Sequence, residues 1–208
     1  MSVSLTNEKK CINMNEDKRI QKTKKSLKEA LLSMLSVEPF ERVTVTKLCD
    51  EANISRVTFY IYYDDKYSLL DELFKDLREE ASRNLKLLEE NNNAKSDPIT
   101  SYRNLLKVII GLYYDHFDFL RHTDEEESPY MYFSFYYYLK RGVEKFINEK
   151  SARLCPKYSI QRTSSFLCNG LWGYIYTARI ERDTREEIEK ESEELLEAIL
   201  NCDFFLKN

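Results

Sequence analysis

Side chains able to hydrogen-bond to a nucleic acid are concentrated in one short stretch of the chain. Hydroxyl, guanidinium and phenol groups follow one another at Ser55, Arg56, Thr58, Tyr60 and Tyr62. Such groups bind phosphate oxygens and base edges, and arginine is the commonest reader of guanine. Phe59 and Tyr63, four residues apart, can face a core instead. This spacing predicts a short helix over residues 56–63 with a polar outer surface and suits DNA contact.

A second short helix precedes this one. Thr44 is placed to cap it, and the residues after Thr44 form an apolar stripe at i, i+3, i+4 and i+7, made of Val45, Leu48, Cys49 and Ala52. Asn53 tolerates the left-handed conformation that a sharp turn between helices needs. Ile54 can then enter the core, and Ser55 can cap the next helix. The pattern over about residues 44–63 predicts a helix-turn-helix.

Positive charge gathers around this motif although the net charge is −4. Residues 1–70 carry 12 Lys and Arg against 10 Asp and Glu, whereas residues 71–208 carry 20 against 26. Much of the excess lies early in a helix with an apolar inner stripe, at Lys18, Arg19, Lys22, Lys24, Lys25 and Lys28. The stripe itself is Leu27, Ala30, Leu31, Met34 and Leu35. The basic surface is either simply solvated or touches phosphate.

The helix-turn-helix residues resemble the DNA-binding domain of the TetR (tetracycline-repressor) family over about residues 18–74. The resemblance rests on the run 52–55, the run 58–63 and Lys66. It departs from the family at Asn53, where glycine is usual, and at Asp64, where a basic residue is common. If Asp65 caps the following helix, Lys66 would meet a phosphate. The predicted DNA contacts are Thr44, Thr46, Ser55, Arg56, Val57, Thr58, Tyr60, Tyr62 and Lys66.

Few turn-forming residues, with only four Gly and four Pro, predict an all-α fold. We expect about nine helices in three regions: a flexible polar N-terminal segment (1–17), a three-helix DNA-binding domain (18–66) and a helical regulatory and dimerisation domain (67–208). Beyond the motif, the predicted helices span about 67–90, 99–122, 130–151, 160–182 and 185–205. Polar joints separate them at residues 91–98, in the charged loop 123–129, around Pro156 and at 183–184.

Neither the cysteines nor the hydropathy suggests a disulfide framework or a membrane protein. The five cysteines form no C-x-x-C pair. Cys49 fits a core position, whereas Cys155 or Cys168 could act as a redox sensor only in a thiolate-stabilising setting. No apolar run approaches ~20 residues, and the polar start lacks a signal-peptide core. We expect a cytoplasmic, nucleoid-associated protein.

The last two predicted helices carry the prediction of a homodimer. Glycines at 170 and 173 interrupt an apolar helical face and cost ~1 kcal/mol each, which favours close helix approach. A monomer core could also use that closeness. The family resemblance implies that the last two helices pair with their symmetry mates. The predicted interface is Phe166, Leu167, Gly170, Leu171, Tyr174, Leu195, Leu196 and Ile199, and a two-fold dimer would read a palindrome in double-stranded DNA.

Aromatic residues crowd the C-terminal region, and two interpretations stay open. They form either ordinary core and interface or the wall of a pocket for a small aromatic or cationic effector. The family resemblance implies release from DNA when such a pocket fills. The predicted pocket residues are Tyr113, Phe117, Tyr136 and Trp172, with His116 as a polar contact.

No catalytic, metal or cofactor motif stands out. His116 and His122 do not share a helical face, and there is no Gly-rich phosphate loop or nucleophile elbow. The acidic runs at 124–127 and 186–194 lack the spacing of a calcium loop and fit solvated faces. The family resemblance implies a repressor that a ligand releases from DNA, and this is the function that we predict. The alternatives are a DNA-bound adaptor whose C-terminal body binds a partner protein and, less favoured, a helical enzyme.

Overall fold

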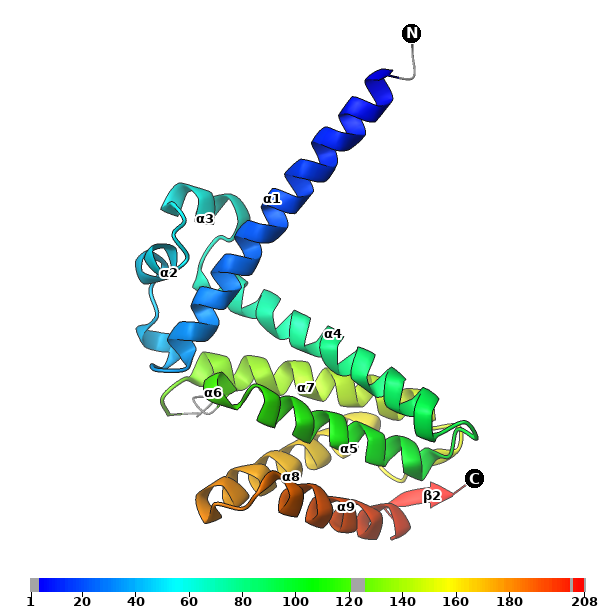
Figure 1. Ribbon diagram of the computed structural model, residues 1–208. Helices are drawn as coiled ribbons and strands as arrows, with labels where there is room; N and C mark the ends of the chain where they lie inside the picture. Colours follow the sequence, from blue (N-terminus) through cyan, green and yellow to red (C-terminus); the bar gives the residue numbers. More distant parts are fainter. Residues whose placement is uncertain (1–3, 121–125, 203, 208) are drawn as a thin grey trace. The chain divides into compact units, whose positions relative to one another are not determined.

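The computed structural model describes residues 4–120, 126–202 and 204–207, and these residues form nine α-helices, one 3-10 helix and two short strands. They fall into two compact units (Figure 1). The head comprises residues 1–73 and 118–131, and the body comprises residues 74–117 and 132–208. The all-α prediction is confirmed. Among the helices of the described part of the chain, none is long and apolar enough to cross a membrane.

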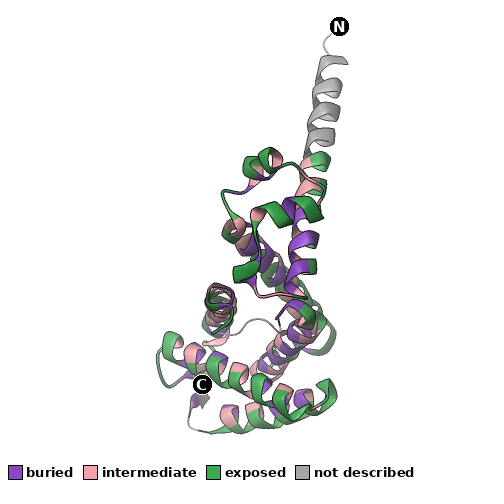
Figure 2. Cartoon of the chain, turned by 90° about the vertical axis from the view of Figure 1, so that its left-hand side faces the viewer, coloured by how far each residue is buried: buried purple, intermediate pink, exposed green. Residues whose placement is uncertain are grey.

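The head is a small helical domain around one apolar core. Its elements are α1 (Ser4–Leu35), η1 (Phe40–Arg42), α2 (Val45–Glu51), α3 (Arg56–Tyr62), the start of α4 (Lys66–Asn92), α6 (Phe117–Leu120) and the start of α7 (Pro129–Lys150). The predicted inner stripe of α1 is buried, and the described part of that helix shows it in purple in Figure 2. Leu48, Phe59, Leu69 and Leu70, all 0% exposed, complete the core from α2, α3 and α4.

Helix α1 begins at Ser4, and this differs from the flexible segment predicted for residues 1–17. The prediction relied on polar composition alone. Residues 4–17 contain no glycine or proline, and once a helix is nucleated each further residue adds a backbone hydrogen bond at little cost. The packed turns of residues 27–35 supply that nucleus. Polarity therefore did not decide the backbone conformation here.

The body packs the rest of α4 with α5 (Pro98–Asp115), α7, α8 (Ile160–Glu181) and α9 (Arg185–Asn201). Helix α5 lies against α9, and ion pairs join them from Arg103 to Glu197 and from Lys107 to Glu193. Two three-residue strands, β1 (Leu154–Pro156) and β2 (Phe205–Lys207), pair antiparallel. The sequence patterns missed these strands because three residues are too few to show alternation.

The predicted helix over residues 99–122 is two helices in the structure. Helix α5 starts at Pro98, capped by the Asp97 carboxylate, which accepts a hydrogen bond from the Thr100 N–H at 2.8 Å. It ends at Asp115, because the next residue, His116, has a φ of −116° and a ψ of 22° outside the helical region, and α6 follows. Of the predicted charged loop, residues 123–125 lie outside the described residues, and so does His122 before it.

A polar cluster around Glu89 joins three helix ends in the body. Its carboxylate accepts hydrogen bonds from Asn93, Ser101, Asn104 and Lys150, so the end of α4, the start of α5 and the end of α7 meet at one group. Burial raises the pKa of Glu89, but these hydrogen bonds outweigh burial and hold that pKa below its usual value. The cluster explains why the polar joint at 91–98 is ordered rather than a free linker.

Candidate nucleic-acid interface

The turn between α2 and α3 is built as its residues suggest. The Thr44 hydroxyl accepts a hydrogen bond from the Lys47 N–H at 3.3 Å and caps α2. Asn53 has a φ of 52°, which is left-handed, so asparagine serves where glycine would be the usual choice. The Ile54 N–H donates to the Cys49 carbonyl at 2.9 Å, and its side chain is half-buried rather than fully in the core. This confirms the helix-turn-helix.

Helix α3 separates an inner face from an outer face. Its cap is Ser55, whose hydroxyl accepts a hydrogen bond from the Thr58 N–H at 3.1 Å. Phe59 is 0% exposed and Tyr63, just past the helix, is 4% exposed, with ring centroids 5.7 Å apart. Of the predicted DNA contacts, Thr44, Thr46, Ser55, Arg56, Val57 and Tyr60 are exposed, and Thr58 and Tyr62 are half-buried. The structure thus leaves hydroxyls, a phenol and a guanidinium accessible around the outer side of α3 and at the start of α2.

Lys66 is placed differently from the prediction. Its ammonium donates to the carbonyls of Phe40 at 2.9 Å, Glu41 at 3.2 Å and Val43 at 2.9 Å. It also lies 4.5 Å from the centre of the Phe40 ring, and burial lowers the pKa of Lys66. An ammonium has three N–H donors, and three carbonyls use them. The predicted phosphate contact does not fit this placement; Lys66 instead ties the turn before α2 to the helix after α3.

The basic surface of α1 divides into paired and exposed lysines. Lys24 and Lys28 each lie 2.9 Å from the Glu72 carboxylate on α4. Burial raises the pKa of Glu72, but the two lysines overcome that effect and lower it to about 2. Lys18, Arg19 and Lys22 are exposed, whereas the exposed Lys25 lies 3.6 Å from the Glu29 carboxylate on the same helix. The cations available for phosphate are therefore those nearer the N-terminal end of the helix.

A segment from the middle of the chain completes the head, and the sequence patterns did not reveal it. The Phe40 N–H donates to the Ser128 hydroxyl at 3.1 Å. Tyr130 stacks on Phe40 with ring centroids 6.0 Å apart, and its hydroxyl donates to the Asp71 carboxylate at 3.2 Å. By sequence, Tyr130 belongs to the predicted helix over residues 130–151 in the aromatic-rich C-terminal region. Co-variation between distant positions in related sequences could have signalled this contact, and one sequence carries no such information.

Three of the five predicted ligand-pocket residues are brought into contact by the structure. Tyr113 meets the rings of Phe117 at 5.8 Å and Trp172 at 5.9 Å, so these three do come together. The His116 ring lies 3.2 Å from the Glu80 carboxylate, and the Tyr136 hydroxyl accepts from Asn169 at 2.9 Å. Beside Tyr136 and Trp172 the side chains leave no cavity volume, about 0 Å³. These edge-to-face rings form a packed cluster, because aromatic pairs fill volume well at such angles.

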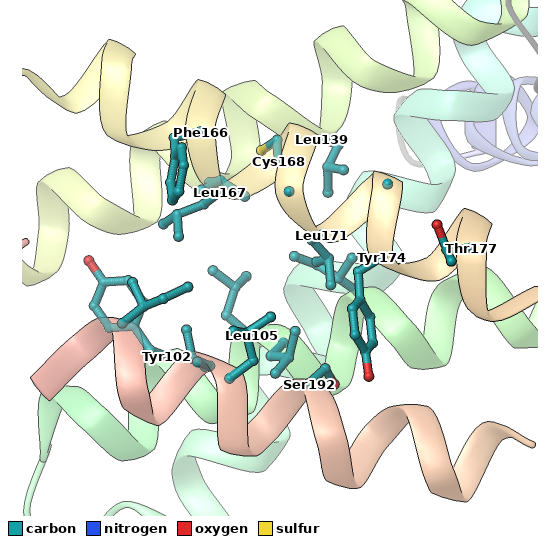
Figure 3. A pocket seen from close by; sticks show the side chains of 18 residues that line it. Tyr102, Leu105, Leu139, Phe166, Leu167, Cys168, Leu171, Tyr174, Thr177 and Ser192 are labelled. Carbon is teal, nitrogen blue, oxygen red and sulfur yellow. The ribbon is translucent and has the colours of Figure 1, made fainter. Parts of the chain in front are cut away.

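An apolar groove opens instead on the face predicted for the dimer. It has a volume of about 460 Å³ and is formed by α5, α7, α8 and α9. Figure 3 shows Leu105, Leu167 and Leu171 projecting into it. All eight predicted interface residues line it, namely Phe166, Leu167, Gly170, Leu171, Tyr174, Leu195, Leu196 and Ile199. A side chain added at Gly170 or Gly173 would meet no atom of the chain within 4 Å, so the expected close approach to these glycines does not occur within one chain.

Two of the described cysteines, Cys49 and Cys168, lie where burial raises the thiol pKa and disfavours the thiolate. Cys49 and Cys168 are buried. Burial raises the pKa of the Cys168 thiol to about 12, so this thiol stays protonated at neutral pH. Cys155 is half-buried on β1 and donates weakly to the Pro156 carbonyl at 3.6 Å. The core interpretation fits Cys49 and Cys168.

Residues 28–73 match the family model of bacterial regulatory proteins of the TetR family. The chain is also 34% identical over 53 residues to YxbF of Bacillus subtilis, described as an uncharacterized HTH-type transcriptional regulator. That match spans 26% of this chain and 14% of YxbF. The family match lies within the head.

Solved structures extend the likeness to the rest of the fold. A Syntrophomonas wolfei protein assigned to the TetR family of transcriptional regulators superposes with a TM-score of 0.70, at 9% identity, over 88% of this chain and 97% of that one. The fatty acid degradation regulator FadR of Bacillus halodurans gives a TM-score of 0.62 at 13% identity, over 83% and 93%. The dihydroxyacetone kinase operon activator DhaS gives 0.51 at 16%, over 86% and 96%. At such identities the likeness establishes the fold.

Proposed function

Because the chain belongs, through its helix-turn-helix domain, to the TetR family of transcriptional regulators, we propose that it is a homodimeric repressor that a small molecule releases from a palindromic operator. The observation that carries this proposal is the exposed surface of α3, where Arg56 and its neighbours stand on a rigidly capped helix. Arg56 would read a guanine, while Thr44, Tyr60 and Tyr62 would bind phosphates. A cytoplasmic, nucleoid-associated location follows from that role.

The homodimer is supported by the open face of α8 and α9. Phe166 is 57% exposed and Leu195 49% exposed on this face, which also holds the two open glycines. Large exposed apolar residues on a continuous surface mark interaction sites, and a partner helix could approach closely at Gly170 and Gly173. A two-fold dimer would place two copies of α3 about 34–36 Å apart, or a multiple of that, on successive turns of DNA.

The last part of the proposal concerns how the dimer represses a promoter and how an effector releases it from DNA. A dimer that covers adjacent major-groove segments would block a promoter. The apolar groove offers a volume suited to a small molecule, so an effector entering it would alter the same face that we assign to the dimer. This moves the proposed effector site away from the packed cluster around Trp172.

The partner-protein alternative is favoured by a separate observation. Phe133 and Tyr137, one helical turn apart on α7, are 55% and 52% exposed and do not line the groove. An apolar pair of this kind outside the dimer face could receive another protein. In that case the chain would be a DNA-bound adaptor.

Selection of binding sites from a randomised duplex library, at moderate salt and with excess competitor DNA, tests the proposal. Recovery of one palindrome, with a dimer in light scattering, is the expected result. The matched control is Lys145→Ala, which removes a charge 80% exposed on α7 and should leave the selected sequence unchanged. Retention of DNA without a shared sequence, and with steep salt dependence, would contradict specific readout and favour the adaptor.

A further inference from the structure

Two apolar side chains are exposed on the outer face of α3. Val57 is 75% exposed and Ile61 is 68% exposed, and they are four residues apart, so they lie on one side of the helix. At ~100° per residue they point away from Phe59, which is fully buried. The most exposed side of the helix is therefore apolar, with the polar Arg56 and Thr58 beside it.

Leaving two branched aliphatic side chains in water forgoes the stabilisation that burial would bring. Neither side chain packs into the head core, because Phe59 and Tyr63 occupy the side that faces this core. The pair is accordingly suited to an apolar surface supplied by a binding partner. On the proposed function, that partner is the major groove of DNA.

We infer that Val57 and Ile61 are specificity residues that contact the 5-methyl groups of thymines in the operator. In the major groove the only apolar group on a base edge is this methyl, and apolar side chains distinguish thymine through it. The inference rests on the proposed function and deepens it, because it assigns the bases that the apolar half of α3 reads.

The spacing of the two side chains limits where the thymines lie. Four residues of α-helix span about 6 Å along the axis, close to two base-pair steps of ~3.4 Å. The two methyl groups are therefore expected within two or three base pairs of each other in each half-site. Because Arg56 directly precedes Val57, a guanine read by Arg56 would lie beside them.

Replacement of thymine by deoxyuridine tests the inference, because uracil differs from thymine only by the missing methyl. Each thymine of the selected operator is replaced in turn, and the dissociation constant is measured for the wild type, Val57→Ala and Ile61→Ala. When a contacted thymine is replaced by deoxyuridine, the wild type should bind about fourfold more weakly, as expected for one buried methyl of ~0.8 kcal/mol. Each variant should lose that effect at its own thymine and keep it at the other.

Val37→Ala provides a matched control, since Val37 is also 75% exposed but lies outside α3. It should respond to uracil as the wild type does. The inference would be overturned if the wild type tolerated uracil at every position, or if the loss of affinity with uracil persisted in both α3 variants. Specific operator binding in either case would leave the proposed function standing. A change of oligomeric state in Val57→Ala or Ile61→Ala, without a change in the uracil response, would overturn it in favour of a second copy covering this face. Failure to select any operator would contradict both this inference and the proposed function.

Discussion

The head and the body assemble their candidate sites in opposite ways. In the head, the predicted DNA contacts from Ser55 to Tyr62 are nearly consecutive, and capping hydrogen bonds within a few residues hold them. In the body, the groove draws on α5, α7, α8 and α9, from Tyr102 to Ile199. A site made within one short helix follows from local residue types. A site made between helices depends on how they pack, and small changes in packing decide whether space is filled or open.

Removal of the Phe59 side chain should give the largest effect and shows whether the short head site depends on its core. Phe59→Ala is expected to lower the free energy of unfolding by about 3–5 kcal/mol, because the ring is fully buried. Urea denaturation followed by circular dichroism measures this. Tyr60→Ala, at a position 50% exposed, is the control and should change stability by about 0.5 kcal/mol or less. Equal losses would contradict the division into inner and outer faces.

Substitutions at Lys66 test whether this residue positions the motif or binds phosphate. Lys66→Met should cost about 1–3 kcal/mol, because three carbonyls lose their donor. Lys66→Arg should not restore stability, since a planar guanidinium cannot replace a compact ammonium among converging carbonyls. The slope of log affinity against log salt should stay unchanged in both variants. A slope smaller by about 0.9 in Lys66→Met, restored in Lys66→Arg, would establish a phosphate contact instead.

Acid should weaken the head through Glu72. Its folded pKa of about 2 lies below the ordinary value of ~4.3, so the unfolded state takes up the proton first. The contribution of Glu72 is therefore present above about pH 4.5 and is lost as the pH falls towards 2. Glu72→Gln should remove about 1–2 kcal/mol at pH 7 and flatten that part of the stability profile. Glu29→Gln, 62% exposed, is the control, and an unchanged profile in Glu72→Gln would contradict the assignment.

Alanine at the open glycines should give the smallest change in stability, but it tests whether the groove face is a dimer interface. Gly142, Gly170 and Gly173 all lie in helices and lack any neighbour within 4 Å of an added Cβ. Each alanine should stabilise a single chain by about 0.5–1 kcal/mol. In the proposed dimer, Gly170→Ala and Gly173→Ala should also shift the protein towards monomer in sedimentation, whereas Gly142→Ala should not. Identical behaviour of all three would contradict a close approach at α8.

Sequence patterns predicted the head better than the body for a definite reason. The caps at Thr44 and Ser55 and the left-handed turn at Asn53 depend on neighbours within three or four residues, and the structure has all of them. The role of Lys66 was missed because its acceptors lie 23 to 26 residues earlier in the chain. The strands β1 and β2 were missed for a different reason, because three residues are too few to show alternation.

Periodicity and capping are local properties of the chain, so the helical class, the helix-turn-helix and the residues that α3 presents could be predicted from residue types and spacing. Helix packing was needed to show that Lys66 serves the fold and that Tyr130 belongs to the head. It also showed that the rings around Trp172 pack against one another while the face with Gly170 is open. The composition of an apolar face shows that it will be covered. Which surface covers it depends on contacts between distant residues, and those exist only once the helices have packed.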